Sequence, residues 1–278
     1  MFRMAMIRLA MTFLAFTSGA AYASTVYATG FEEPSFTTGS IAGQNGWEVF
    51  GSAISTVETF NVYAGSQAVF VDGSAAGQSG PYWADPTPDT NSLIQLSAEI
   101  YIASSLQESQ WQLAATSPGF GAFIGGIDLV PDMSDPGVDN IELVSGANPV
   151  VGTFDLNQWN LVDLVFNMTT QTYSLSVNGT TLTSDAAFCG STVGCSGATI
   201  ASYGDSLFDV FGGKGGDNDA GFMDNFSLSN VSAVPEPKSP IFLVGAGLAL
   251  VYAARRTRAR RLTMFYFASE VRSSRCNT

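Results

Sequence analysis

Between residues 24 and 231, apolar and polar positions alternate with a period of two, and no long stretch has helical periodicity. The clearest case is residues 159–166, where Val162, Leu164 and Phe166 fall on one face of an extended chain. A short polar segment follows, and residues 172–177 alternate in the same way. This pattern predicts a β-hairpin.

Similar short runs of Val, Ile, Phe, Thr and Tyr recur along this segment and are separated by Gly-rich turns. They predict further strands over residues 25–31, 66–72, 94–102, 111–115, 122–129, 141–144, 180–183, 206–211 and 221–231. About ten short strands of this kind are typical of an all-β, antiparallel two-sheet sandwich. Residues 73–91 are rich in Gly, Pro and Asp and are expected to form a loop.

The first 23 residues have the pattern of a secretory signal peptide. Two arginines precede an apolar run over residues 9–16, and the small-x-small pattern of residues 21–23 fits a cleavage site. The apolar run is short for the alternative, an N-terminal membrane anchor, which needs about 20 residues. We therefore expect a signal helix that is cleaved before Ser24.

A second pattern lies near the C-terminus. Pro235, Glu236 and Pro237 precede an apolar run over residues 240–254, which predicts a single transmembrane helix. The basic cluster that follows contains Arg255, Arg256, Arg258, Arg260 and Arg261. By the positive-inside rule this cluster stays in the cytoplasm and the preceding segment lies outside. The alternative, a buried core helix, does not explain the abrupt basic flank.

The tripeptide, apolar helix and basic cluster together resemble the PEP-CTERM sorting signal of Gram-negative bacteria. The resemblance covers residues 234–261, with the motif at 234–237. It implies an exosortase-type processing enzyme as a partner. It also implies anchoring in the inner membrane during transit, followed by delivery to the cell surface or extracellular matrix, where the family is associated with extracellular polysaccharide and biofilm. Residues 262–278 form an atypical tail that such signals usually lack, so the exported domain is expected over 24–233.

Charge and composition exclude several functions. Residues 24–234 hold 22 of the 24 acidic residues and only one of the 11 basic ones, Lys214, for a net charge of −21. Nucleic-acid binding needs clustered Lys and Arg, so it is not expected. The chain has no His, which excludes Ser-His-Asp triads and His-ligated zinc.

Short motifs in the exported segment resemble concanavalin A-like, or laminin-G-like, jelly rolls and related carbohydrate-binding modules. These motifs are Gly30-Phe31-Glu32, Gly46-Trp47, residues 63–68, residues 159–179 and residues 224–228. The resemblance implies a jelly-roll sandwich and a structural calcium held by Glu32 and Asp224. Asp217 and Asp219, in a Gly-rich loop nearby in sequence, are further candidate ligands, because calcium prefers carboxylate oxygens. The alternative is that all four are solvated turn residues.

A second acidic series runs through Asp128, Asp132, Asp135, Asp139 and Glu142. Its spacing would align it on one face of a helix, but Pro131, Pro136 and Gly137 favour a long loop, with a second cation site as a weaker alternative. Glycosidases need two paired carboxylates, yet the Glu-x-Asp-x-x-Glu strand motif of jelly-roll glucanases is absent. We therefore predict a non-enzymatic structural or adhesive protein of the envelope or extracellular matrix, with extracellular polysaccharide and calcium as candidate ligands. A secreted polysaccharide-active glycoside hydrolase is the alternative. A passive domain that only keeps the matrix hydrated is a third interpretation.

The remaining candidates are aromatic and sulfur side chains. Tyr82 and Trp83 lie in the expected loop and are candidates for exposed rings that stack on sugars, whereas the other tryptophans are expected in the core. Cys189 and Cys195 are expected to form a disulfide in an oxidising compartment, with two free thiols as the alternative.

Overall fold

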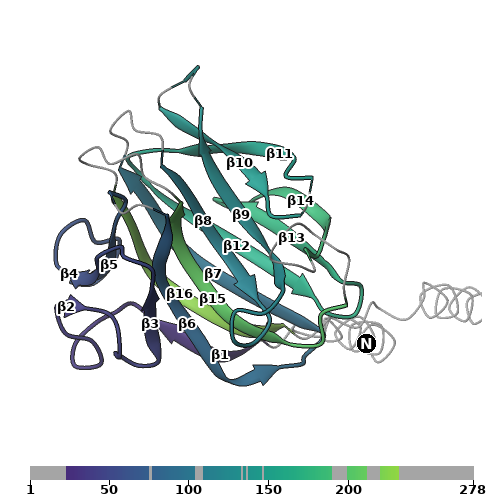
Figure 1. Ribbon diagram of the computed structural model, residues 1–278, viewed down its shortest axis with the longest axis horizontal. Coiled ribbons are helices and arrows are strands. Elements are labelled where there is room, and N and C mark those ends of the chain that lie inside the picture. Colours follow the sequence, from purple (N-terminus) through teal and green to yellow (C-terminus); the bar gives the residue numbers. More distant parts are fainter. Residues whose placement is uncertain are drawn as a thin grey trace, which may run out of the picture. The chain divides into compact units, whose positions relative to one another are not determined.

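The computed structural model describes residues 23–74, 77–103, 109–132, 134–135, 137–145, 147–189, 199–211 and 220–231 (Figure 1). The chain divides into one unit of residues 21–232 and a second that comprises 1–20 and 233–278. The expected signal peptide, sorting signal and tail lie outside the described residues. Every secondary-structure element within the described residues is a β-strand. These residues contain no helix that is long and apolar enough to cross a membrane.

Two antiparallel sheets form the described domain. The nine-stranded sheet has the order β14-β13-β12-β7-β16-β5-β4-β2, and β1 also pairs with β16. Its strands are β1 (Ala23–Thr29), β2 (Gly39–Ser40), β4 (Ser55–Glu58), β5 (Ala68–Asp72), β7 (Leu93–Ala103), β12 (Trp159–Asn167), β13 (Thr172–Val177), β14 (Thr180–Ala187) and β16 (Ala220–Val231).

The seven-stranded sheet has the order β11-β10-β9-β8-β15-β6-β3. Its strands are β3 (Trp47–Phe50), β6 (Gln78–Asp89), β8 (Gln110–Thr116), β9 (Phe123–Pro131), β10 (Val138–Leu143), β11 (Val150–Asp155) and β15 (Tyr203–Phe211). The chain changes sheet at each step from β5 to β8, so strands that are distant in sequence become neighbours. The prediction of an all-β antiparallel two-sheet sandwich is confirmed.

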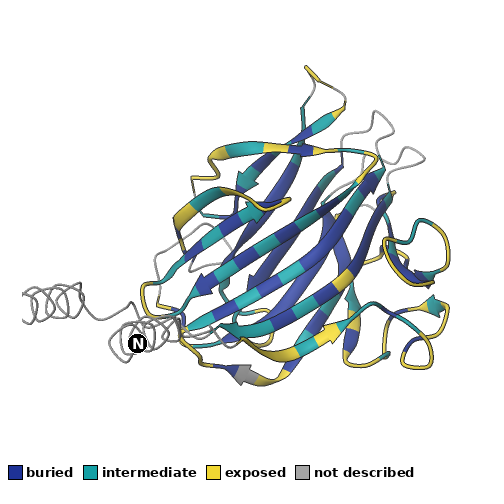
Figure 2. Cartoon of the chain, turned by 180° about the vertical axis from the view of Figure 1, so that it is seen from behind, coloured by how far each residue is buried: buried dark blue, intermediate teal, exposed yellow. Residues whose placement is uncertain are grey.

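Period-two alternation decides which side chains enter the core. In the predicted hairpin, Val162 lies opposite Val177 and Phe166 opposite Tyr173, and all four are buried. Figure 2 shows the same alternation of buried and intermediate positions along neighbouring strands. The hairpin and its face assignment are therefore confirmed.

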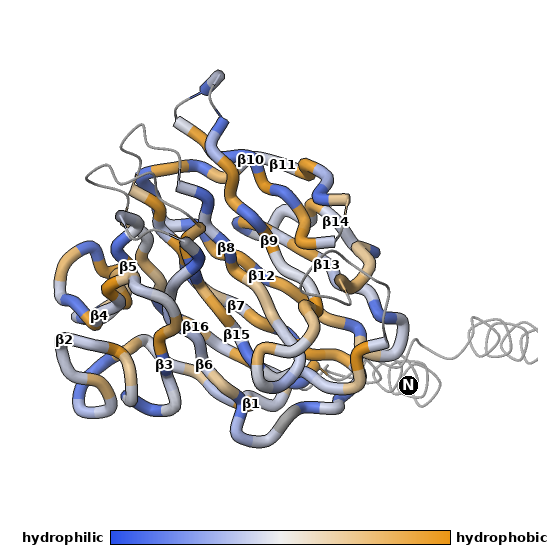
Figure 3. The backbone as a smooth tube through the Cα atoms, viewed as in Figure 1, coloured by the Kyte–Doolittle hydropathy of each residue, from blue (hydrophilic) through white to orange (hydrophobic). Residues whose placement is uncertain are grey.

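Glycines let the two sheets approach each other closely. A Cβ on Gly221 of β16 would lie 2.4 Å from the Trp111 ring of β8, and one on Gly125 of β9 would lie 2.5 Å from the Tyr173 ring of β13. The Tyr173 hydroxyl donates a hydrogen bond to the Gly126 carbonyl at 3.0 Å. Hydrophobic positions recur along the strands of both sheets (Figure 3), and the buried ones form one continuous core.

Two expectations about irregular segments are wrong. Most of residues 73–91 is not a loop but strand β6, which is paired on one side with β15 and on the other with β3. The acidic series is not a long loop either, because Asp128 lies on β9 and Asp139 and Glu142 lie on the adjacent β10. In both cases pairing with other strands overrides the local Pro and Gly signals.

Candidate functional site

A cavity of about 230 Å³ opens on the outer face of the seven-stranded sheet, the face turned away from the nine-stranded sheet. We call it the outer cavity. It is lined by Phe50, Gln78, Thr116, Phe120, Gly121, Phe123 and Leu207, which come from β3, β6, β8, β9, β15 and the turn between β8 and β9. Residues from five strands and a turn thus converge on one hollow.

Three aromatic rings, Phe50, Phe120 and Phe123, line the outer cavity, and Tyr82 packs behind Phe120. Phe120 packs edge-on against Tyr82, with ring centroids 4.4 Å apart, and against Phe50 at 5.4 Å. Phe120 is 38% exposed, so one side of its ring remains free. Its φ of 53° lies in the left-handed region, which is unfavourable for a bulky side chain. Such outliers persist only where the surrounding structure imposes them, and they cluster at functional sites.

A carboxyl group lies next to the polar lining at each end of the cavity. The Oδ2 atom of Asp205 accepts hydrogen bonds from the Phe120 amide at 2.8 Å and the Thr116 hydroxyl at 3.3 Å. The Oδ2 atom of Asp209 accepts one from the Gln78 side-chain amide at 2.7 Å. Both carboxyl groups are buried, so they hold the lining residues Thr116, Phe120 and Gln78 in place.

Polar side chains continue from Asp209 across three more strands. Asp209 of β15 lies opposite Gln112 of β8, which lies opposite Asp128 of β9, which in turn lies opposite Glu142 of β10. The Gln112 amide donates to Asp128 Oδ1 at 2.7 Å. We call these four residues the acidic row.

Burial changes the protonation of the acidic row. Desolvation raises the pKa of Asp128 to about 6; hydrogen bonds from Gln112 and Gln110 oppose this rise, and repulsion from Glu142 adds to it. Desolvation also raises the pKa of Asp209 well above its usual value, and the Gln78 hydrogen bond offsets only part of this. At pH 7 a carboxyl group with a pKa of about 6 is mostly ionised, so Asp209 is the member of the row that burial pushes toward the neutral form. A neutral carboxyl group can donate as well as accept a hydrogen bond.

The two aromatic candidates have different positions. Tyr82 lies on the outer face and contacts Phe50 and Phe120. Burial raises the pKa of its hydroxyl, and so does the charge of Glu48 and Asp205. The expectation that Trp83 is an exposed loop ring is wrong: it is 5% exposed, lies in β6 and stacks on Tyr27 at 4.5 Å. Trp47 and Trp111 are buried as expected, whereas Trp159 is only partly buried.

The candidate calcium ligands Glu32 and Asp224 lie near each other and anchor the same loop. Glu32 accepts hydrogen bonds from the Ser66 amide at 2.7 Å, the Ser66 hydroxyl at 2.5 Å and the Gln67 amide at 3.1 Å. Asp224 Oδ2 accepts the Tyr63 and Ala64 amides at 3.2 and 3.0 Å. Residues 63–67 are thus tied down by two carboxylates from distant parts of the chain.

These donors stabilise the charged form of Glu32 more than that of Asp224, whose pKa is raised because desolvation outweighs its hydrogen bonds. Desolvation raises the pKa of Glu32, but the hydrogen bonds from Ser66 and Gln67 outweigh it, so the pKa is lowered. Within the described part of the chain, no three acidic or cysteine side chains gather in a group that could hold a metal. Asp217 and Asp219 lie outside it, so calcium binding stays a prediction.

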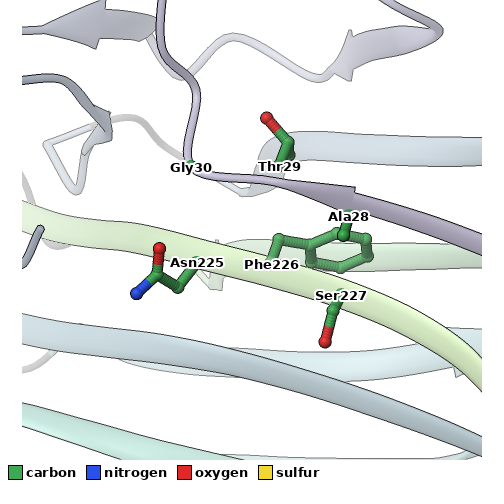
Figure 4. A pocket seen from close by; sticks show the side chains of 6 residues that line it. All are labelled: Ala28, Thr29, Gly30, Asn225, Phe226 and Ser227. Carbon is green, nitrogen blue, oxygen red and sulfur yellow. The ribbon is translucent and has the colours of Figure 1, made fainter. Parts of the chain in front are cut away.

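A shallow hollow of about 310 Å³ adjoins this pair (Figure 4). Its lining residues come from the end of β1 and the middle of β16, and the polar ones are Thr29, Asn225 and Ser227. Glu32 and Asp224 are not among them, because their oxygens face the 63–67 loop.

Cys189 is disulfide-bonded, and its expected partner, Cys195, lies outside the described residues.

Sequence patterns did not identify the outer cavity. Leu207 lies in a predicted strand and Gln78 in the expected loop, and neither Phe50 nor Phe120 was singled out. Only the motif Gly119-Phe120-Gly121, an aromatic residue between two glycines in a turn, signals an exposed ring. The acidic row was also missed, because its members come from four separate strands.

The comparisons with known proteins concern the fold. No family model matches the sequence, and neither does any curated protein. Similar solved structures include a sialidase, with a TM-score of 0.49 at 10% identity over 66% of this chain; the chain spans 17% of that protein. An endo-1,3-beta-glucanase from Streptomyces sioyaensis has a TM-score of 0.48 at 11% identity, covering 76% of this chain and 97% of its own. Lectin II from Ulex europaeus has a TM-score of 0.42 at 12% identity, covering 74% of this chain and 100% of its own. These likenesses concern the arrangement of strands alone.

Proposed function

We propose that this chain is an exported protein whose β-sandwich binds extracellular polysaccharide in the outer cavity without cleaving it. The observation that carries the proposal is the ring of Phe120, which is held over the cavity in a strained backbone conformation beside Tyr82 and Phe50. Binding sites typically combine apolar and aromatic walls with a few fixed polar groups. Gln78 and Thr116 supply those groups here.

The size and charge of the site favour a small neutral sugar unit. Its volume of about 230 Å³ is below the roughly 300–1,000 Å³ typical of pockets for drug-sized ligands. A single sugar unit within a longer chain suits this space better than a bulky ligand. The carboxylates of Glu48 and Asp205, which lie near Tyr82, would repel acidic sugars.

The test is binding of the full-length chain to an array of neutral polysaccharides: laminarin, xylan, hydroxyethylcellulose and dextran. Phe120→Ala should weaken binding roughly tenfold or more, because a buried aromatic contact contributes over 1 kcal/mol. Val150→Ala is the matched control, since this exposed apolar residue lies on β11 at the opposite edge of the sheet from β3. Equal binding by wild type and Phe120→Ala would refute binding at the cavity.

Export and sorting form the second part of the proposal. The signal-like residues 1–23, the Pro235-Glu236-Pro237 motif, the apolar run and the arginine cluster support transit through the inner membrane and processing by an exosortase-type enzyme. The cell surface or matrix is then the destination. Intact mass of the native protein from host fractions tests this: the expected product begins near Ser24 and ends near 234–237. A product that ends at Thr278 and stays in the membrane would contradict it.

A polysaccharide hydrolase is the second candidate, and one observation favours it. The pKa of Asp128 is raised to about 6, the range of a general acid, and Glu142 lies directly opposite on the same face. Release of reducing ends from the same polysaccharides distinguishes the two functions. The binding proposal predicts none above the level of an Asp128→Asn variant, whereas release that this substitution abolishes would establish hydrolysis.

A further inference from the structure

Four aromatic side chains form a straight line across the outer face of the other, nine-stranded sheet. Trp159 of β12 lies opposite Tyr101 of β7. On the other side of Tyr101 lies Phe222 of β16, and beyond it Phe70 of β5. Successive ring centroids are 5.6, 5.8 and 5.4 Å apart. We call these four residues the aromatic row. Since neighbouring strands are about 4.8 Å apart, the row spans roughly 14 Å.

The loop after β4 adds a ring at each end of the row. Phe60 packs against Phe222 at 5.6 Å and Phe70 at 5.8 Å, and Tyr63 packs against Trp159 at 5.8 Å. Phe60 is 52% exposed and Tyr63 48% exposed. Phe222 is buried beneath Phe60, whereas Phe70, Tyr101 and Trp159 are partly exposed. This surface lies on the side of the sheet away from the core and contributes nothing to the packing between the sheets. Aromatic surface that gathers in this way outside the core marks an interaction site.

The anchored loop fixes the position of Tyr63. Asp224 accepts the Tyr63 and Ala64 amides, and Glu32 accepts the amides of Ser66 and Gln67. The Tyr63 hydroxyl donates a hydrogen bond to Glu99. Glu99 lies opposite Asp224, two residues along β7 from Tyr101 of the aromatic row. The exposed rings are thus preorganised, which reduces the entropy lost on binding.

The polar groups beside the row indicate the chemistry of the ligand. Among the residues that the structure describes, none is basic, so an acidic polymer would meet only repulsion. The two nearest carboxyl groups, Glu99 and Asp224, are buried and already hold donors from the loop, so they are poorly placed to pair with a cationic protein. Self-association through this face would bring two acidic surfaces together, with no basic residue among the described ones to pair with Asp163.

Neutral sugar chains fit this surface. The C–H faces of sugar rings pack on aromatic rings, and a neutral sugar chain meets no charge repulsion here. We propose that the aromatic row, with Phe60 and Tyr63, is a second binding surface for neutral polysaccharide. The outer cavity and the row lie on opposite outer faces of the sandwich, so one domain would hold two polymer chains and cross-link them. This inference rests on the proposed polysaccharide binding and adds a second site to it.

Cross-linking gives a readout that a single site cannot produce. The full-length chain is mixed with a neutral polysaccharide that it binds, and turbidity and binding stoichiometry are recorded. We expect the wild type to cross-link the polymer with two sites per chain. Trp159→Ala should abolish cross-linking and leave one site, and Tyr63→Ala, on the exposed loop, should weaken the same site without altering a strand. Val165→Ala is the matched control, since it lies on the same face of β12 away from the row.

The cavity variant separates the two proposals. Phe120→Ala should also abolish cross-linking but keep the row's site, and the double variant Phe120→Ala/Trp159→Ala should not bind. If Trp159→Ala and Tyr63→Ala cross-link like the wild type while Phe120→Ala does not, the row is refuted and the cavity stands. If Phe120→Ala changes nothing and Trp159→Ala removes all binding, the cavity and the bivalent domain are refuted. Dimerisation without polysaccharide, or binding of a basic peptide, that Trp159→Ala abolishes would overturn the proposed ligand.

Discussion

Asp209 and Gln112 face each other across β15 and β8, and each keeps one buried oxygen without a hydrogen-bond donor. These oxygens are Asp209 Oδ1 and Gln112 Oε1, while the other polar atoms of the two side chains bond to Gln78 and Asp128. Both oxygens are acceptors, so the two opposite side chains cannot satisfy each other while Asp209 is ionised. A proton on Asp209 Oδ1 resolves this, because the carboxyl can then donate to Gln112, and burial raises the pKa of Asp209 in that direction.

Asp209→Asn should therefore stabilise the protein at pH 7. An amide can accept from Gln78 with its oxygen and donate to Gln112 with its nitrogen, without a proton having to be taken up. The expected gain in unfolding free energy is a few kcal/mol, because at pH 7 the wild type must take up a proton on a carboxyl group whose usual pKa is 3.8. Denaturant unfolding measures it.

Asp209→Ala is the control for this substitution, since it leaves both glutamines without their partner and should destabilise the fold. Below pH 3.8, where the carboxyl is protonated in both states, the wild type and Asp209→Asn should have similar stability. Equal stability of the wild type and Asp209→Asn at pH 7 would contradict a protonated Asp209.

Asp128 should make the domain more stable in mild acid than at neutral pH. Its pKa is about 6 in the folded state against a usual 3.8, so the folded state binds the proton more tightly. The stabilisation is fully present below pH 3.8 and is lost as the pH rises through about 6. The difference of about 2 units corresponds to roughly 3 kcal/mol. Melting temperature between pH 4.5 and 7.5 measures it.

The stabilisation from Glu32 depends on pH in the opposite direction, because the pKa of Glu32 is lowered in the folded state. Its contribution to the unfolding free energy is present above pH 4.5 and is lost as the pH falls below that value. The window from pH 4.5 to 7.5 therefore separates the two groups. Asp128→Asn should reduce the slope of the profile in that window and leave the part that comes from Asp209. A wild type whose melting temperature rises from pH 4.5 to 7.5 would be inconsistent with this account.

Gly65→Ala should break the loop anchor. Gly65 has a φ of 77°, and an added Cβ would lie 2.1 Å from Glu32 Oε1, so the carboxylate would have to leave the amides of Ser66 and Gln67. Gly77→Ala is the matched control, with a φ of 84° and nothing within 4 Å of the added Cβ. Because hydrogen bonds to charged groups contribute about 1.5–3 kcal/mol, Gly65→Ala should cost at least about 1 kcal/mol more than Gly77→Ala in thermal or denaturant unfolding. Equal losses would show that Glu32 does not hold the loop.

Calcium binding by Glu32, Asp217, Asp219 and Asp224 predicts a metal-dependent stability. At a calcium concentration 100-fold above the dissociation constant, one site adds about 2.7 kcal/mol, and a chelator removes it. Thermal melting of the full-length chain with millimolar calcium and with chelator measures this. An unchanged melting temperature would leave Glu32 and Asp224 as hydrogen-bond anchors only.

Strands with strong alternation were predictable because their signal is local. The hairpin that ends at Val177 has apolar residues at every second position, and the structure places them in the core as predicted. Strand β6 was missed because Pro81, Pro86 and Gly80 are breaker residues in isolation. In the fold Gly80 instead permits close approach, since a Cβ there would lie 2.4 Å from the Phe208 carbonyl oxygen.

The sequence by itself determined the all-β class, the acidic character of the domain and the apolar faces of its best strands, since each follows from residue type and period. It also pointed to Glu32 and Asp224 as a pair, through resemblance. Tertiary structure alone decided the outer cavity, the acidic row and the aromatic row. Trp159, Tyr101, Phe222 and Phe70 are far apart in the chain and align only because β12, β7, β16 and β5 pair in one register. Register between distant strands is set by the packing of the whole core, which no local pattern records.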